Sequence, residues 1–346
     1  MKYKKLGRTG LDVSLIGLGT MTWGQQNTQD EGFEQMDYAL EQGINFFDTA
    51  EMYAVPPSAD TYGKTEAIIG NWFATRKNRG KVILASKIAG PALPWIRDGK
   101  SQIDRKNILL AVEDSLTRLK TDYIDLYQLH WPNRGSYHFG QIWDYAPDFD
   151  KQAVEDNFID VLETLQELIQ AGKIRHIGLS NETAWGTSKW LELAEKYNLP
   201  RMASIQNEYS LMARHFEPDL SEIAIHEECG LLAWSPLTRG LISGKYLNGA
   251  MPKGTRLDID TRVEHRINPQ TDAAIEAYIA LAKEHNLDVC QMALAFINQQ
   301  PFVTSNLIGA TTMQQLKSNI ASIDITLSEG VIDGIKSIRR QYPTPF

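Results

Sequence analysis

The sequence predicts a single-domain (β/α)8 barrel, and three observations support this prediction. Short apolar runs alternate with longer segments of helical period, which is typical of parallel strands joined by crossover helices. The chain has 346 residues, a length that such barrels reach as one domain. Three polar residues at predicted strand ends, Asp48, Lys87 and His130, are 39 and 43 residues apart, and 346 residues divided over eight units gives about 43 each.

We expect eight strands, each a short apolar run. Residues 1–14 precede them and have the pattern of a β-hairpin with its turn near Arg8 to Gly10, which can close the amino-terminal end of the barrel. The expected strands cover residues 15–18, 45–48, 82–86, 124–130, 174–180, 204–206, 231–235 and 307–308.

Two of the connecting helices carry clear terminal signals. Asp104 is a suitable N-cap, and Ile103 and Ile108 are spaced for a hydrophobic staple. A second helix is expected over residues 155–171, with Gly172 as its left-handed stop. The apolar stripe of the first helix consists of Ile108, Val112, Leu116 and Leu119. Helices of this kind complete the β/α units of a TIM barrel.

A doubly wound sheet is the structural alternative. The segment GLGTMTWG contains Gly17 and Gly19, but it lacks the third glycine of a dinucleotide-binding turn and a clear partner acid about 20 residues later. The barrel is therefore the favoured architecture.

Composition excludes several classes of protein. The net charge of −8 argues against a nucleic-acid partner, although a few local Lys and Arg residues can still hold the phosphates of a cofactor. No stretch approaches the roughly 20 apolar residues that cross a bilayer, and the amino terminus lacks the features of a signal peptide. We expect a cytoplasmic protein without a membrane partner. Cys229 and Cys290 are expected to be reduced thiols, and no metal site is expected.

Two insertions interrupt the regular spacing of the units. Residues 131–154 form an aromatic loop, and residues 237–269 form a second loop rich in glycine and basic residues. Long loops on one rim usually bind a ligand, although a packed lid without substrate contact is the alternative for the aromatic loop. We expect Trp23 and Trp131 to line a substrate pocket for a hydrophobic, planar carbonyl compound.

The polar residues at the strand ends suit carbonyl reduction by a hydride donor. Tyr53 is a phenol with an ordinary pKa near 10, and an ammonium about 4 Å away lowers that value by up to about three units before the cost of burial. Lys87 can supply this charge, Asp48 can keep Lys87 protonated, and a neutral His130 can polarise the substrate oxygen. The alternatives are a purely structural ion pair with a core histidine, and a Schiff-base aldolase that uses Lys87.

Ordered motifs along nearly the whole chain resemble the aldo/keto reductase family. They are GLGTMTWG, FFDTAEMYA, ASK, YQLHWP, GKIRHIGLSN, IQNEYS, WSPLTRGLISGKY and LIGATTMQQLKSNI. The length and the insertion after LHWP are similar to those of a bacterial branch near the potassium-channel β-subunit type. The resemblance implies a (β/α)8 barrel, NADP(H) bound without a Rossmann turn, reduction of small aldehydes or ketones, and a catalytic tetrad of Asp48, Tyr53, Lys87 and His130.

The resemblance also implies cofactor-binding residues around the nicotinamide. Gly19, Thr20 and Met21 match the loop beside the nicotinamide ribose and pyrophosphate, and Asp48 borders the same site. Ser180, Asn181 and Gln206 match positions that bind the carboxamide, and Tyr209 matches the ring that stacks on the nicotinamide.

A second group of positions matches the phosphate and adenine end of the cofactor. Arg256, displaced by one residue, matches the arginine that holds the 2′-phosphate, and Gly309 and Thr311 precede a helix amino terminus. Gln315 and Asn319 match the adenine side, where Ser318 departs from the family pattern. The pyrophosphate segment consists of Trp234, Ser235, Pro236, Leu237, Thr238, Arg239, Gly240, Leu241, Ile242, Ser243, Gly244 and Lys245.

The sequence leaves the cellular role open. Barrels of this type also serve as cofactor-sensing regulatory subunits, and the tetrad alone does not prove turnover. The physiological substrate and the oligomeric state do not follow from the sequence.

Overall fold

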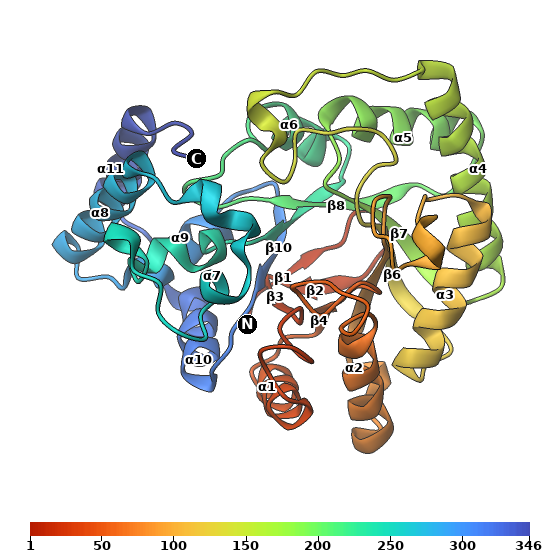
Figure 1. Cartoon of the computed structure of the whole chain (residues 1–346), viewed down its shortest axis with the longest axis horizontal. Helices are drawn as coiled ribbons and strands as arrows, with labels where there is room; N and C mark the ends of the chain where they lie inside the picture. The colour runs from red at the N-terminus through yellow and green to blue at the C-terminus, as the bar shows by residue number, and fades with distance from the viewer.

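The computed structural model describes residues 1–346, apart from the side chains of residues 261 and 263, which fall within the second predicted insertion and lie outside the described part. Parallel strands close into a barrel in the order β10-β3-β4-β5-β6-β7-β8-β9, with helices outside it (Figure 1). The predicted (β/α)8 barrel is confirmed. Its strands are β3 (Ile16–Gly19), β4 (Phe46–Asp48), β5 (Ile83–Ile88), β6 (Ile124–Leu129), β7 (Ile174–Ser180), β8 (Met202–Glu208), β9 (Gly230–Trp234) and β10 (Val303–Ile308).

The last strand is longer than the sequence predicts. β10 begins at Val303, four residues before the predicted apolar pair of residues 307–308, and all six of its residues are buried. The polar residues are accommodated because they have partners: Ser305 donates to the Ser14 carbonyl at 2.8 Å, and Asn306 donates to the Asn298 side chain at 2.9 Å. Hydrophobicity alone does not reveal such a strand.

The predicted amino-terminal hairpin is confirmed. β1 (Tyr3–Lys5) pairs with β2 (Asp12–Ser14) in antiparallel register. Leu6, between them, is fully buried against apolar side chains from inside the barrel, so the hairpin closes the amino-terminal end. Gly7 has φ +53°, and a Cβ there would lie 2.5 Å from the Ala203 carbonyl oxygen, so only glycine fits this approach.

Most of the outer helices begin at polar caps, and they bury apolar side chains against the barrel. Asp104 caps α3, as predicted, and its side chain accepts a hydrogen bond from the backbone N–H of Asn107 at 2.8 Å. α4 begins four residues earlier than predicted because Asp150 caps it. The helices are α1 (Gln29–Glu41), α2 (Lys64–Arg76), α3 (Arg105–Leu119), α4 (Lys151–Gln170), α5 (Ala184–Lys196), α6 (Asp219–His226), α7 (Arg256–Ile259), α8 (Pro269–Glu284), α9 (Val289–Asn298), α10 (Met313–Ala321) and α11 (Glu329–Gln341).

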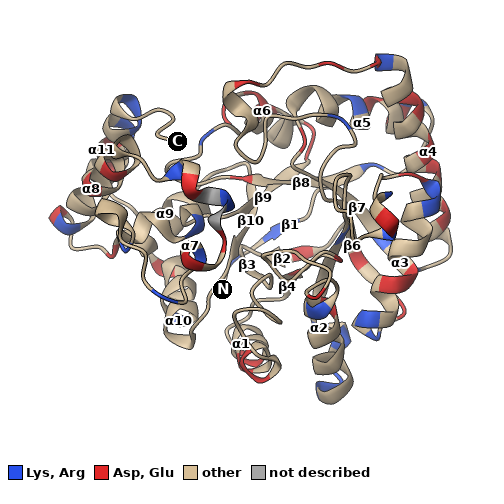
Figure 2. Ribbon diagram, in the orientation of Figure 1, with Lys and Arg blue, Asp and Glu red and all other residues tan. Residues whose placement is uncertain are grey.

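Short 3-10 helices lie in the loops, and three of them, η4, η5 and η6, belong to the second insertion. They are η1 (Arg79–Lys81), η2 (Arg97–Gly99), η3 (Gln141–Trp143), η4 (Thr238–Ser243), η5 (Leu247–Gly249), η6 (Thr261–Arg266) and η7 (Ser322–Asp324). Charges of both signs are interspersed over the outer helices (Figure 2). Among the described residues, no helix combines the length and the apolar character needed to cross a membrane.

Candidate active site

The four polar residues singled out in the sequence lie at the carboxyl ends of three adjacent strands. Asp48 is the last residue of β4, Lys87 lies in β5, and His130 follows β6. β4 pairs with β5 and β5 with β6, so the three side chains enter one end of the barrel side by side. Tyr53 follows on the loop after β4. This arrangement places them where the active sites of such barrels are found.

A buried ion pair lies at the centre of this group. Lys87 Nζ donates to Asp48 Oδ2 at 2.6 Å and to the Thr49 carbonyl at 2.8 Å, and the two charged side chains are 0% and 4% exposed. Asp48 Oδ1 accepts from the amides of Gln128 at 3.0 Å and Gln206 at 2.8 Å. The carboxylate therefore has three donors around it, which fixes its position.

The lysine stays protonated because of this pairing. Burial alone would lower the pKa of Lys87, but the nearby Asp48 carboxylate and the Tyr53 hydroxyl outweigh burial, so the pKa lies above its ordinary value. A Schiff-base nucleophile needs a neutral amine. The environment of Lys87 opposes that state.

Tyr53 faces the interior of the site next to the lysine and the histidine. Lys87 Nζ lies 5.1 Å from the centre of the Tyr53 ring, and the rings of Tyr53 and His130 meet edge to face with centres 5.7 Å apart. Burial raises the pKa of the Tyr53 phenol, and the opposing effect of Lys87 does not cancel it. The expected lowering by the ammonium is thus outweighed by desolvation, and Tyr53 holds its proton at neutral pH.

His130 is neutral in this environment. Burial, followed by the charge of Lys87, holds the pKa of its imidazole well below the ordinary value. Its Nδ1 is buried and has no partner among the described residues. The ring lies beside Trp131, with centres 4.9 Å apart. A neutral imidazole here can donate one hydrogen bond to a ligand.

The site opens into a cavity of about 830 Å³ that runs from Tyr53 and His130 across the rim to α10. Such a volume is ample for a large ligand. The structure brings most of the predicted residues to its wall: Gly19, Thr20, Met21, Asp48, Tyr53, His130, Trp131, Ser180, Asn181, Gln206, Trp234, Ser235, Pro236, Leu237, Arg239, Gly240, Ser243, Lys245, Arg256, Gly309, Thr311, Gln315 and Asn319.

Other predicted residues are absent from this wall. Trp23 is fully buried in the core, where its indole donates to Gln35 at 3.1 Å, so the prediction that it lines the substrate pocket is wrong. Tyr209 is also fully buried and packs edge to face on Phe302, which leaves no face for a nicotinamide. The ring that does line the cavity at a strand end is Trp234. Four residues of the pyrophosphate segment likewise do not line it: Thr238, Leu241, Ile242 and Gly244.

The amides at the ends of β7 and β8 form one network. Asn181 donates to the carbonyl of His130 at 2.8 Å and accepts from the Trp234 indole at 3.2 Å. Gln206 uses its amide hydrogens on Asp48 and Gln128, at 2.8 and 3.1 Å. Its Oε1 accepts no bond from the described residues, and Gln206 lines the cavity, so this oxygen is available to accept a bond from a ligand.

The sequence does not identify Gln128, Arg262 or His265 as site residues, and it indicates Phe139 only as one ring of the aromatic loop. Gln128 is two residues before His130, and residues two apart on a strand share a face, so this spacing is a usable signal. Phe139, from the aromatic loop, lines the cavity and stacks on Trp234 with ring centres 6.2 Å apart. The loop is therefore not a lid remote from the cavity, although its Trp143 is 68% exposed.

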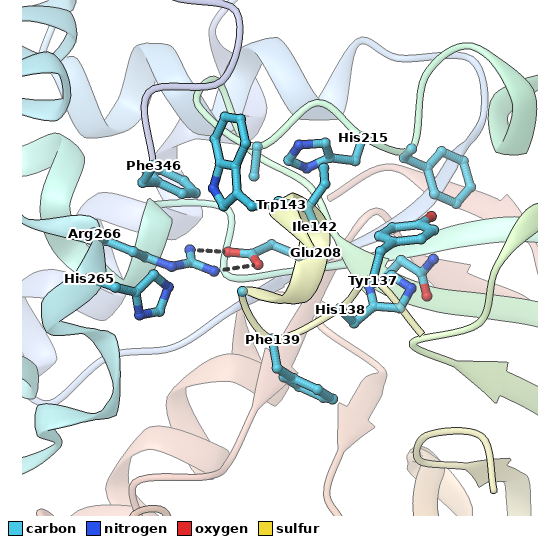
Figure 3. Close-up of a pocket in the computed structure, with 14 residues that line it drawn as sticks. Tyr137, His138, Phe139, Ile142, Trp143, Glu208, His215, His265, Arg266 and Phe346 are labelled. Carbon is cyan, nitrogen blue, oxygen red and sulfur yellow. Dashed lines mark hydrogen bonds and ion pairs between the residues drawn. The ribbon is translucent and has the colours of Figure 1, made fainter. Parts of the chain in front are cut away.

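A smaller cavity of about 40 Å³ lies beside the large one, beneath the aromatic loop (Figure 3). Arg266 donates twice to Glu208 there, at 2.5 and 2.8 Å, and His265 lies next to Arg266. Phe139 and His265 line both cavities. The two insertions thus meet at this point above the barrel.

The large cavity has the charges that an anionic cofactor needs. Three of the cationic side chains on its wall are Arg239, Lys245 and Arg256. Buried Nε atoms of Arg239 and Arg256 have no partner among the described residues, which is costly unless an anion approaches them. Lys245 and Arg256 fit the phosphates of a nicotinamide cofactor, and Arg239 is a further site for an anionic group. Among the described residues, no cluster of acids, histidines and cysteines is arranged to hold a metal ion.

Comparisons with known proteins point in the same direction as the geometry. The model of the aldo/keto reductase family matches residues 15–340. The chain is 48% identical over 348 residues to Protein tas of Escherichia coli (strain K12). The matched region covers 100% of this chain and 99% of that protein. It is 34% identical over 349 residues to Uncharacterized oxidoreductase YrpG of Bacillus subtilis (strain 168), and the matched region covers 100% of this chain and 97% of that protein. It is 36% identical over 258 residues to Aldo-keto reductase of Babesia bovis, and the matched region covers 69% of this chain and 88% of that protein.

Proposed function

Because the chain belongs to the aldo/keto reductase family, a family of oxidoreductases, we propose that it reduces an aldehyde or ketone to an alcohol with NADP(H). In this proposal Tyr53 is the proton donor. The observation that carries it is the buried Lys87–Asp48 pair beside Tyr53, with neutral His130 on the same cavity wall. These groups supply what carbonyl reduction requires of a protein.

The proton comes from Tyr53. Its raised pKa keeps the phenol protonated until the carbonyl oxygen gains negative charge, and the adjacent Lys87 ammonium then stabilises the phenolate that is left. Asp48 is a positioning residue that keeps Lys87 charged and oriented. His130, being neutral, donates a hydrogen bond that polarises the carbonyl oxygen.

NADP(H), when bound, supplies the hydride. Gln206 Oε1 and the amide of Asn181 are the groups that we propose for the carboxamide, and Trp234, rather than Tyr209, takes the stacking role. Lys245 and Arg256 are proposed for the phosphates. Arg256 is suited to the 2′-phosphate because its side chain is 12% exposed and, among the described residues, its one ion pair is with Asp260, at 3.1 Å. The preference for NADP(H) over NAD(H) rests on this arginine.

The other functions considered have less support. An aldolase would need a neutral Lys87, and the Asp48 carboxylate opposes that state. A cofactor sensor would use the same cofactor-binding residues, so only the rate of carbonyl reduction distinguishes it from a reductase. No observation in the described residues favours it over the reductase.

Turnover with a panel of aldehydes, ketones and quinones tests the proposal. We expect loss of NADPH absorbance near 340 nm that depends on both enzyme and carbonyl compound, with the alcohol as product. The cofactor dissociation constant is measured in parallel by quenching of tryptophan fluorescence. Tight NADPH binding without reduction of any carbonyl would favour the sensor, and trapping of a substrate on Lys87 by borohydride would favour the aldolase.

A further inference from the structure

Arg239 is a cation on the wall of the large cavity without an anionic partner of its own. It lies in η4, the first helical segment after β9, in a left-handed conformation with φ +57°. It makes no hydrogen bond or ion pair with any residue that the structure describes, and its Nε is buried. A buried guanidinium without a partner is unfavourable, which is consistent with the fall of its pKa to about 10 on burial.

The acids nearest to Arg239 are already used by other arginines. Glu208 receives both hydrogen bonds of Arg266. Asp260 receives two bonds from Arg262, both at 2.7 Å, and an ion pair from Arg256 at 3.1 Å. Both carboxylates act on Arg239 electrostatically, but neither forms an ion pair or hydrogen bond with it among the described residues. Arg239 therefore adds a positive charge without a direct partner to the cavity.

The Arg239 guanidinium lies beside aromatic side chains of the cavity wall. Its central carbon is 5.6 Å from the centre of the Trp234 ring, which also stacks on Phe139 from the aromatic loop. Its charge helps to lower the pKa of His265, which lines both cavities where the two insertions meet. Aromatic side chains and the Arg239 guanidinium thus line the same cavity as Tyr53 and His130.

We propose that Arg239 binds a carboxylate on the carbonyl substrate, so that the preferred substrates are anionic aldehydes or ketones. This inference rests on the proposed reductase function and specifies its substrate class. The resemblance assigns the whole segment from Trp234 to Lys245 to the cofactor without separating backbone from side-chain roles. The segment can serve the pyrophosphate through its backbone while the Arg239 side chain faces the substrate.

The test compares three benzaldehydes that differ only at the para position: 4-carboxybenzaldehyde, its methyl ester and benzaldehyde. The measured quantity is the ratio of kcat/KM for the acid to kcat/KM for the ester. We expect wild type to favour the acid, and Arg239→Met to lower the ratio by about 10- to 100-fold, the range of a charge-assisted hydrogen bond. Arg239→Lys should retain part of the preference.

Lys253→Met is the matched control, because Lys253 is an exposed cation on the rim of the same cavity. It should lower the ratio far less if Arg239 makes a direct contact rather than contributing to a general field. The NADPH dissociation constant is measured for each variant by fluorescence. A ratio that Arg239→Met leaves unchanged overturns the inference, as does a large loss of NADPH affinity in its place, which would assign Arg239 to a cofactor phosphate. Reduction of all three aldehydes without preference would overturn only this inference, whereas no reduction at all would overturn the proposed function with it.

Discussion

Replacing Asp48 with asparagine removes the counter-ion of Lys87 while nearly keeping the shape of the side chain. The ammonium would then lie in a fully buried position, with a neutral amide where the carboxylate was 2.6 Å away. Removing one partner of a buried pair typically costs about 3–5 kcal/mol because the remaining charge is uncompensated. We expect a loss of this size in the free energy of unfolding at pH 7.

The dependence of this loss on pH follows from the pKa of Lys87. In wild type that pKa lies above the unfolded value of about 10.4, so the pair stabilises the fold below that pH and loses its effect as pH rises through the folded pKa. In the variant, burial acts without the carboxylate and lowers the pKa. Lys87 of the folded variant therefore loses its proton as pH rises. The difference between variant and wild type in the free energy of unfolding should become smaller between pH 7 and about 9.5.

Urea unfolding followed by circular dichroism, with refolding checked, measures both effects. Asp333→Asn is the control, since its pair with Lys336 lies at the surface with side chains 70% and 65% exposed. It should leave the midpoint nearly unchanged. The reasoning is refuted if Asp48→Asn stays within about 1 kcal/mol of wild type at pH 7, or if its deficit grows as pH rises.

Three further predictions concern the rest of the site. Arg256→Ala should weaken NADPH binding by at least about tenfold and NADH binding far less, measured as dissociation constants; an equal effect on both would contradict the 2′-phosphate role. The His130 ring signals, assigned by NMR against His130→Gln, should not titrate between about pH 5.5 and 8, because the pKa is held well below its ordinary value; a midpoint in that range would contradict a neutral imidazole. Gln128→Leu removes a donor to Asp48 and should lower kcat by about tenfold with little change in the KM for NADPH, whereas an unchanged kcat would show that Asp48 needs no such support.

The barrel and the convergence of the four polar residues could be predicted because both follow from regular spacing. Successive β/α units deliver their strand ends to one rim, so Asp48, Lys87 and His130 had to meet if the barrel formed. The longer extent of β10 could not be predicted, because its polar residues are stabilised by partners that are distant in sequence, such as Ser14 for Ser305.

The aromatic residues were the least predictable part of the site. Trp23 and Tyr209 lie near strand ends in the sequence, yet both turn into the core, while Trp234 and Phe139 face the cavity. Which way a ring turns in a loop depends on packing between elements and not on local period. The lack of an ion-pair partner for Arg239 could not be predicted either, because it depends on Glu208 and Asp260 being paired with other arginines.

The central claim is that Tyr53 donates the proton, and the most direct measurement is the single-turnover rate of NADPH oxidation by Tyr53→Phe with a good aldehyde substrate. The variant keeps the ring and loses only the hydroxyl, so it should fold and bind NADPH as wild type does. We predict a fall of about 10²- to 10⁴-fold in the rate, the usual contribution of a general acid. A folded variant that binds NADPH and reduces the aldehyde at a rate near that of wild type would contradict the account.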